Sequence, residues 1–245
     1  MFDQPGMGEE ALNKVAEIGL ASQLDEVENL DVDIKTDPFK LIQGEVDSVS
    51  IDGDGLVMQS DLRVEELDMH MTSVAINPLS VALGKIELTK PTKASVRAVL
   101  TEADINRAFN SDYVRQQLQQ QIHVNDQLVT IDAQQVDFRL PGEGKVALNA
   151  SVRLQETGQT HQVAFSAVPC VSAGGQSVSL ENVEYGDTEE LSPELTQALI
   201  AETSDILNLS NFDLEGMTLK INNLQVEAGK ITLQAEAHVE QIPSG

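Results

Sequence analysis

The sequence of 245 residues predicts an α+β fold, in which a long curved antiparallel sheet wraps amphipathic helices. Several segments alternate strictly between apolar and polar residues, which is typical of strands with one buried and one solvent-exposed face. Other segments place apolar residues at steps of three and four, which is typical of helices with one apolar stripe. Because the dry face of such a sheet needs a cover, the helices are expected to pack on it.

A helix and a hairpin are the first predicted elements. Apolar residues recur at helical spacing from Leu12 to Val27, which corresponds to a helix of about five turns. Alternation from Leu30 to Ile34, and again at Val49 and Ile51, predicts two strands. The Asp52-Gly53-Asp54-Gly55 cluster that follows is expected to form a hairpin turn.

The middle of the chain continues as strands. Between Leu56 and Ile76 the alternation changes phase, which predicts a β-bulge near Glu65 and Glu66, because a regular strand keeps its facing. Asn77-Pro78-Leu79 should end this strand, and a short helical turn is expected at 80–84. Strand character resumes at Ile86 and Leu88, and again from Ala94 to Ala98.

Two further helices are predicted from their capping residues. Thr101 can cap a helix whose apolar spacing extends to Ile122. Ser192 as the cap, with Pro193 at the first helical position, predicts the third helix. Two strands, Gln162–Val168 and Val178–Tyr185, are expected between the second and third helices.

Each of these helices leads into one copy of a repeated strand pair. Gly144–Ala150 recurs as Gly229–Ala235, and the alternating residues of 129–140 match those of 217–228. Pro141-Gly142-Glu143 accounts for the extra length of the first copy and is expected to lengthen its hairpin turn.

The domain organisation follows from this repeat. We expect a single domain over residues 1–245 that contains two repeat units, 101–155 and 192–240, preceded by a disordered segment at 1–8.

Composition narrows the class of partner and the compartment. With 40 Asp and Glu against 15 Lys and Arg, the formal net charge of −25 repels nucleic acid and opposes electrostatic docking on anionic membranes. A single cysteine, Cys170, excludes an intramolecular disulfide and fits a reducing compartment. No signal peptide and no transmembrane segment are recognised, so the sequence predicts a cytoplasmic protein, at most peripheral to a membrane.

No pattern of catalytic or metal-binding residues stands out. The four histidines are far apart in sequence, and Asp52-Gly53-Asp54-Gly55 has its glycines too early for an EF-hand. Nucleophile-elbow, Walker and dinucleotide-binding motifs are absent from the sequence. We therefore expect no enzyme activity, no metal and no cofactor.

The inward-facing strand positions carry many alanines and aliphatic residues, and two interpretations remain open. In one, helices pack closely on the sheet and fill the core. In the other, the covered face is incompletely filled and forms an apolar groove for acyl chains, as ligand sites are concave and mostly apolar. Residue spacing does not distinguish them.

Three segments of the middle region carry a family resemblance: 61–64, 73–79 and Leu100–Ala108. They resemble the LmeA-like family of phospholipid-binding proteins in its cyanobacterial version, and the resemblance extends over most of the chain. It implies a fold similar to tubular lipid-binding proteins, in which a curved sheet encloses helices and an apolar lumen.

The resulting functional hypothesis is non-enzymatic binding, and possible transfer, of phospholipid or glycolipid, with transient membrane contact. The alternative is an acidic scaffold or assembly factor with a filled core and no lipid. The predicted lipid-binding residues lie on the first helix and on facing strands of the two repeats: Leu12, Val15, Ala16, Leu20, Val146, Leu148, Ala150, Ile231, Leu233 and Ala235. Ala150→Trp or Ala235→Trp is expected to block loading while leaving the fold largely intact.

Overall fold

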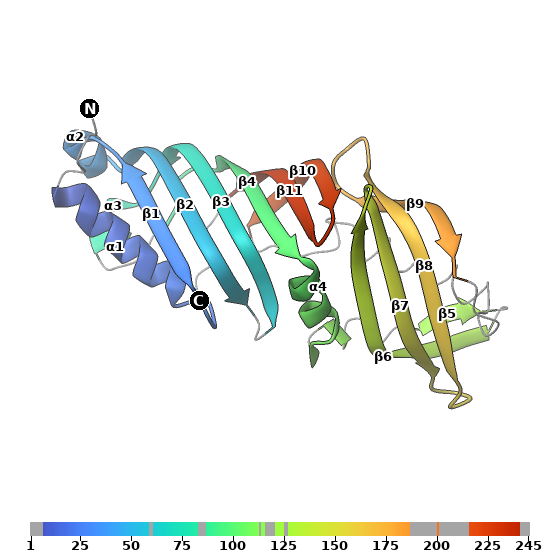
Figure 1. Cartoon of the computed structure of the whole chain (residues 1–245). Coiled ribbons are helices and arrows are strands. Elements are labelled where there is room, and N and C mark those ends of the chain that lie inside the picture. Colours follow the sequence, from blue (N-terminus) through green and yellow to red (C-terminus); the bar gives the residue numbers. More distant parts are fainter. Residues whose placement is uncertain are drawn as a thin grey trace.

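A computed structural model of the chain describes residues 7–58, 61–82, 87–112, 114–115, 121–124, 127–186, 200 and 216–240. The described strands form two open antiparallel sheets that lie end to end, with few helices (Figure 1). The general α+β class predicted from the sequence is confirmed. Where the sequence predicted one long wrapped sheet, however, the described strands form two.

The first sheet has six strands in the order β1-β2-β3-β4-β11-β10, and the second has five in the order β5-β6-β7-β8-β9. The strands of the first sheet are β1 (Asn29–Lys35), β2 (Glu45–Met58), β3 (Leu62–Ala75), β4 (Thr92–Thr101), β10 (Met217–Glu227) and β11 (Lys230–Val239). Those of the second are β5 (Gln121–Val124), β6 (Gln127–Gly142), β7 (Lys145–Leu154), β8 (Thr160–Val171) and β9 (Val178–Tyr185). The helices are α1 (Met7–Ala21), α2 (Pro38–Ile42), α3 (Pro78–Ala82) and α4 (Glu102–Phe109).

Helix α1 is held along the free edge of β1 by side chains that accept backbone hydrogen bonds. The amide of Ile34 donates to Asn13 Oδ1 at 2.9 Å, and the amide of Thr36 donates to Glu9 Oε1 at 3.0 Å. These contacts satisfy donors that an edge strand would otherwise leave open. The helix ends at Ala21, earlier than the predicted Val27. Of the expected disordered segment, 1–6 lies outside the described residues, whereas residues 7 and 8 belong to α1.

The predicted turn at Asp52-Gly53-Asp54-Gly55 is wrong, because these residues lie within β2. A side chain at Gly53 would place Cβ 2.9 Å from Leu56 Cδ1, so this glycine serves close packing within a strand. The β-bulge predicted near Glu65 and Glu66 is also wrong, because a bulge would shift the pairing of β2 with β3 and no such shift occurs there. Pairing passes from Asp54–Glu66 to Leu56–Val64 in constant register, and Gly55 has a φ of +58°.

Asp52 stands between two other carboxylates on the solvent face, because its cross-strand partners are Asp31 on β1 and Asp68 on β3. Burial, followed by the charges of Asp68 and Asp31, raises the pKa of Asp52 above 3.8. The folded protein therefore holds this proton more tightly than the unfolded chain, and this contribution to stability falls as the pH rises above about 4.

We expect Asp52→Asn to raise the free energy of unfolding at neutral pH by about 0.2–1 kcal/mol, because like charges directly opposite one another destabilise a sheet. The gain should shrink as the pH falls and vanish at about pH 3, where the carboxyl of the parent is mostly protonated in both the folded and the unfolded state. Urea denaturation at both pH values measures it. Asp33→Asn is the matched control, since Asp33 lies 3.4 Å from Lys35 Nζ, and equal stabilisation by both variants would contradict the assignment.

The elements around the sheet junction agree with the capping pattern. Thr101 caps α4 with a full capping box: Asp104 N donates to Thr101 Oγ1 at 3.2 Å, and Thr101 N donates to Asp104 Oδ2 at 2.9 Å. The helix ends at Phe109, however, and Ile122 lies in β5. The short helical turn predicted at 80–84 is present as α3, which begins two residues earlier, at Pro78, while residues 83 and 84 lie outside the described residues.

Both predicted hairpins of the repeat are present, as β6–β7 and β10–β11. Each has a register shift at matching positions, between Ala133 and Gln135 and between Ile221 and Asn223. The expected longer turn in the first copy is wrong. Both hairpins turn at two residues, 143–144 and 228–229, and the extra residues lengthen β6 with a second register shift. The helix predicted from Ser192 lies outside the described residues, apart from Ile200.

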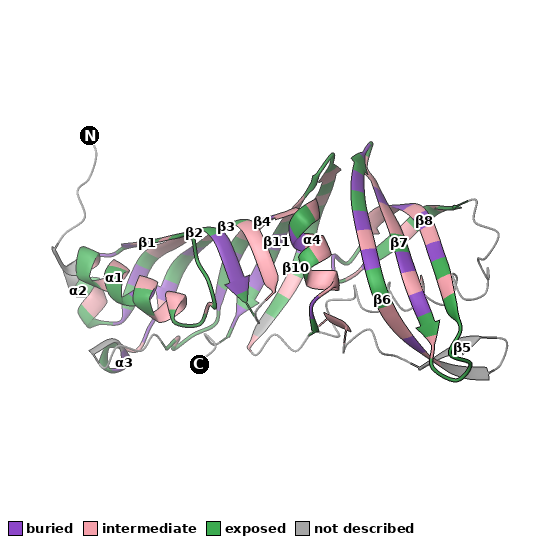
Figure 2. Ribbon diagram, turned by 60° about the horizontal axis from the view of Figure 1, so that its bottom comes forward, coloured by how far each residue is buried: buried purple, intermediate pink, exposed green. Residues whose placement is uncertain are grey.

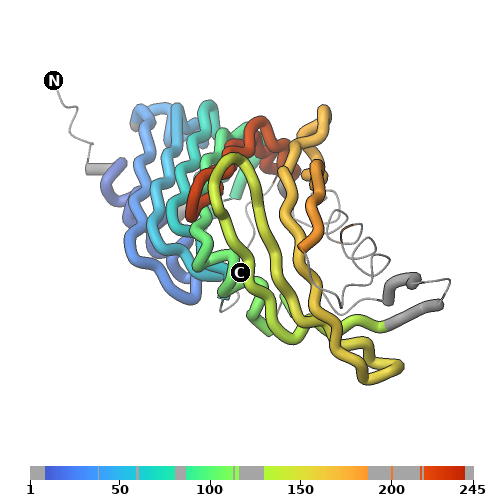
Figure 3. The backbone as a smooth tube through the Cα atoms, turned by 45° about the vertical axis from the view of Figure 1, so that its right-hand side comes forward, coloured from blue at the N-terminus to red at the C-terminus, as the bar shows by residue number. Residues whose placement is uncertain are grey.

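The buried apolar residues form two clusters, one for each sheet. Between them, α4 and the β10–β11 hairpin join the sheets, and Figure 3 shows this hairpin next to β6 and β7. Gly229 N donates to Leu140 O at 3.0 Å, while Asn106 binds both backbone groups of Phe138, at 2.7 and 2.8 Å. Phe109 stacks on Phe138 with ring centroids 5.9 Å apart.

Candidate functional site

A cavity of about 360 Å³ lies between α1 and the first sheet. Every lining side chain except that of Gln23 is apolar. They come from α1 and the turn after it, from β1, β2 and β3, from the segment after β3, and from β11: Leu12, Val15, Ala16, Leu20, Gln23, Leu24, Leu30, Val32, Ile34, Val46, Val49, Ile51, Leu56, Met58, Leu67, Met69, Met71, Val74, Ile76, Leu88 and Val239.

One part of the sheet wall of the cavity depends on a phase change near Gly55 in β2. Val49 and Ile51, at odd positions, and Leu56 and Met58, at even positions, all line the same cavity. A regular strand would direct odd and even residues to opposite faces. The positive φ of Gly55, between the two groups, marks where the facing changes. The glycine therefore extends the apolar wall toward the end of β2.

The helical wall is formed by the apolar stripe of α1, whose position is fixed by the polar contacts of Glu9 and Asn13 to the edge of β1. Ala16 is almost fully buried, whereas Val15 and Met58 are 38% and 42% exposed. The lining therefore reaches the surface at the middle of α1 and at the end of β2.

Among the described residues, no charged side chain lines this cavity, so its lining is that of a hydrocarbon environment. Apolar cavities of this kind stay dry and accept apolar ligands. Met58, Met69 and Met71 contribute flexible, polarisable side chains, which adapt to ligands of varied shape. The site is thus suited to binding and offers no acid–base pair. Within the described part of the chain, no group of three or more His, Cys, Asp or Glu side chains could hold a metal ion.

Four of the sequence-predicted lipid-binding residues line the cavity: Leu12, Val15, Ala16 and Leu20. The six strand residues do not. Val146 and Ala150 belong to the core cluster of the second sheet, where Leu148 and Ile231 pack against it. Ala235 is buried and Leu233 half-buried in β11.

Sequence reasoning missed the cavity residues on β1, β2 and β3. The strands of the two repeated hairpins show the same alternation, so the pattern favoured them equally as the wall opposite α1. The pairing of α1 with β1 is a long-range contact, which residue spacing does not encode. The concentration of methionine on β2 and β3 was the available signal, since three of the six methionines line the cavity.

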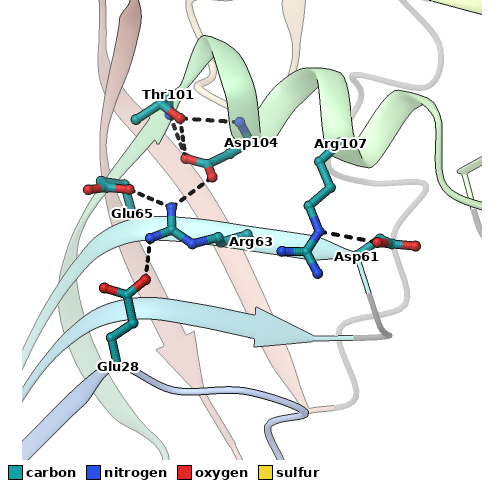
Figure 4. Close-up of polar contacts among 7 residues, drawn as sticks. All are labelled: Glu28, Asp61, Arg63, Glu65, Thr101, Asp104 and Arg107. Carbon is teal, nitrogen blue, oxygen red and sulfur yellow. Dashed lines mark hydrogen bonds and ion pairs between the residues drawn. The ribbon is translucent and has the colours of Figure 1, made fainter.

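Beyond the cavity, Arg63 on β3 connects three carboxylates (Figure 4). Its guanidinium donates to Asp104 Oδ1 and to Glu28 Oε1, each at 2.8 Å, and also to Glu65. Asp104 is 4% exposed. Burial alone would raise the pKa of Asp104, but hydrogen bonds from Thr101 and Arg63 outweigh it and hold the pKa below 3.8. This network fixes α4 and the loop before β1 to β3.

A family model described as LmeA-like phospholipid-binding matches residues 5–236, nearly the whole chain. No curated protein and no solved structure matches the sequence. Among the described residues, no helix has the length and apolar character needed to cross a membrane.

Proposed function

Because the chain belongs to the LmeA-like phospholipid-binding family, we propose that the cavity between α1 and the first sheet holds an acyl chain of a phospholipid. The observation that carries this proposal is the lining, in which Gln23 is the one polar side chain among twenty-one residues. An acyl chain needs such a surface and makes no demand for hydrogen-bond partners inside it. The polar head group would remain outside, where Val15 and Met58 reach the surface.

The volume sets the length of chain that fits. At about 30 Å³ for each water-sized group, 360 Å³ accommodates roughly a dozen methylenes. Each methylene removed from water contributes about 0.8 kcal/mol, and part of the total is offset by the lost freedom of the bound lipid. A single acyl chain is therefore the natural ligand of this cavity, and a second chain would need space outside it.

We further propose that the protein carries phospholipid or glycolipid between membranes. The formal charge of −25 supports brief visits to a membrane, because an acidic exterior does not adhere to anionic lipids. The predicted strand positions from Val146 to Ala235 would then belong to a second apolar surface on the repeat, separate from the α1 cavity.

The end-to-end sheets support a fold related to the tubular lipid-binding proteins. The matching register shifts in β6 and β10 support an internal duplication of the hairpin. In this interpretation each half of an elongated molecule contributes one sheet, and the α1 cavity occupies the first half.

Uptake of a short-chain phosphatidylcholine, supplied below its critical micelle concentration, tests the proposal. We expect native mass spectrometry to detect about one bound lipid per chain, and lipid extraction of freshly purified protein to release acyl lipid. Protein that neither carries lipid nor takes it up would contradict the proposal and favour the acidic scaffold.

A further inference from the structure

Two short helices lie at one end of the first sheet. Helix α2 runs into β2, and α3 follows β3, which pairs with β2. Ile76 N donates to Gly44 O at 2.8 Å, and a Cβ on Gly44 would lie 3.2 Å from Pro78 Cδ. The turn after α2 therefore contacts the residues at the start of α3, and both helices lie at the same end of the sheet, with α2 next to the N-terminal part of α1 (Figure 2). We call α2 and α3 together the helical tip.

The helical tip carries the most exposed large apolar side chains of the described residues. Phe39, Ile42 and Leu79 are each 77% exposed, while Leu41 packs inward against the core cluster of the first sheet. In the described part of the second sheet, the most exposed large apolar residue is Tyr185, at 49%. Exposed apolar side chains thus gather at the end of the molecule that contains the cavity.

The tip is continuous with one end of the cavity. Val46, two residues after Gly44, and Ile76, two residues before Pro78, both line the cavity. We infer that the helical tip docks on a phospholipid bilayer with neutral head groups, and so brings the cavity to the membrane from which its lipid comes. This inference rests on the proposed function.

Charge favours a neutral bilayer over an anionic one. The single lysine of the tip, Lys40, has its ammonium 2.6 Å from Asp47 Oδ1, and Asp37 accepts from Phe39 N at 2.8 Å. The described residues of α2 and α3 therefore present no free basic cluster for anionic lipid, and the charge of −25 opposes an anionic surface. Amphipathic helices at a membrane surface bury their apolar side chains at the boundary between head groups and acyl chains, which is the position inferred for Phe39, Ile42 and Leu79.

The chain has no tryptophan, so Phe39→Trp introduces one tryptophan, whose emission can be excited separately from that of the two tyrosines, into the tip. With phosphatidylcholine vesicles, we expect the emission maximum to move to shorter wavelength as the indole leaves water. Tyr185→Trp on β9 is the matched control and should keep its emission. A wavelength shift from Tyr185→Trp alone would overturn the assignment of the docking surface.

Removing the three exposed side chains tests the tip directly. The triple variant Phe39→Ser, Ile42→Ser, Leu79→Ser should bind phosphatidylcholine vesicles at least about tenfold more weakly in flotation assays, because binding scales with buried apolar area. Its thermal unfolding should stay close to that of the parent, since these side chains are mostly exposed. Its uptake of monomeric short-chain phosphatidylcholine should be unchanged.

Three outcomes overturn the docking inference alone: vesicle binding that the triple variant retains, tighter binding to phosphatidylglycerol than to phosphatidylcholine vesicles, and a parent dimer that the triple variant converts to monomer without vesicle binding. The last would make the tip an interface between two copies. Failure of the parent to take up monomeric lipid would contradict the proposed function instead.

Discussion

Replacing Arg63 by alanine is expected to destabilise the protein by about 3 kcal/mol, because it leaves a buried carboxylate without its cationic partner. Asp104 is 4% exposed, and the side chain of Arg63 is itself only 18% exposed. After the substitution, Asp104 keeps only its hydrogen bonds with Thr101. Urea denaturation at neutral pH, with the fluorescence of the two tyrosines or circular dichroism as the signal, measures the loss.

The pH dependence gives a second signature of the same substitution. Since the pKa of Asp104 is lowered in the folded protein, its stabilising contribution is present above about pH 4 and is lost as the pH falls through the folded pKa. Without Arg63 that pKa rises, so acid should cost the variant less stability than it costs the parent.

Arg97→Ala is the matched control. Arg97 also binds two carboxylates, Glu66 at 3.0 Å and Asp68 at 2.6 Å, but it is 39% exposed and both partners are 48% exposed. An exposed pair contributes only about 0–1 kcal/mol. If Arg63→Ala and Arg97→Ala lowered the free energy of unfolding equally, burial of the ion pair would not explain the effect of Arg63→Ala. Adding Asp104→Asn to Arg63→Ala should recover part of the loss, because it removes the unpaired charge.

Ala16→Leu is expected to weaken lipid uptake by about thirtyfold. The side chain adds three carbon atoms to the α1 wall, and displacing two to three methylenes of an acyl chain loses about 2 kcal/mol of transfer free energy. Leucine suits a helix, and it fills empty volume, so the free energy of unfolding should be unchanged or higher. The short-chain phosphatidylcholine assay measures the affinity.

Ala150→Leu serves as its control in the other sheet. Ala150 is buried in the core cluster around Val136 and Val163, where added volume should cost about 1–3 kcal/mol of stability. Uptake per folded molecule should not change. Loss of uptake from Ala150→Leu, with normal uptake by Ala16→Leu, would move the lipid site to the predicted hairpin surface. The sequence alone predicts that Ala150→Trp and Ala235→Trp block lipid loading. Since neither alanine lines the α1 cavity, neither substitution is now expected to block uptake there.

Local patterns predicted the individual elements well. Alternation identified the strands on both sides of Gly174, and the capping pattern located the first turn of α4, because both depend on neighbouring residues. The Asp52–Gly55 segment misled because its composition matches a turn. Asp52 and Asp54 continue the outward-facing alternation of β2, and the packing of Leu56 over Gly53 becomes visible only in three dimensions.

The sequence predicted the helical wall of the site but not its sheet wall. The stripe of α1 shows in the sequence which side of the helix must be covered, and Leu12 and Leu20 do face the cavity. Which strands lie opposite depends on the hydrogen bonds of Glu9 and Asn13 to β1, contacts between residues more than twenty positions apart. The hairpins at β7 and β11 show the same apolar alternation but face other partners, so pattern alone could not choose between them.

The attachment of α1 links ligand exchange to the risk of self-assembly. If α1 moved away from the sheet to admit a large ligand, the amides of Ile34 and Thr36 would lose their hydrogen-bond acceptors. The edge of β1 would then be open to pairing with a strand from another molecule. Admission of cargo by that route would expose the protein to fibril-like pairing. Glu9 and Asn13 therefore have two roles, because they hold α1 in place and also protect the edge of β1 from pairing with another molecule.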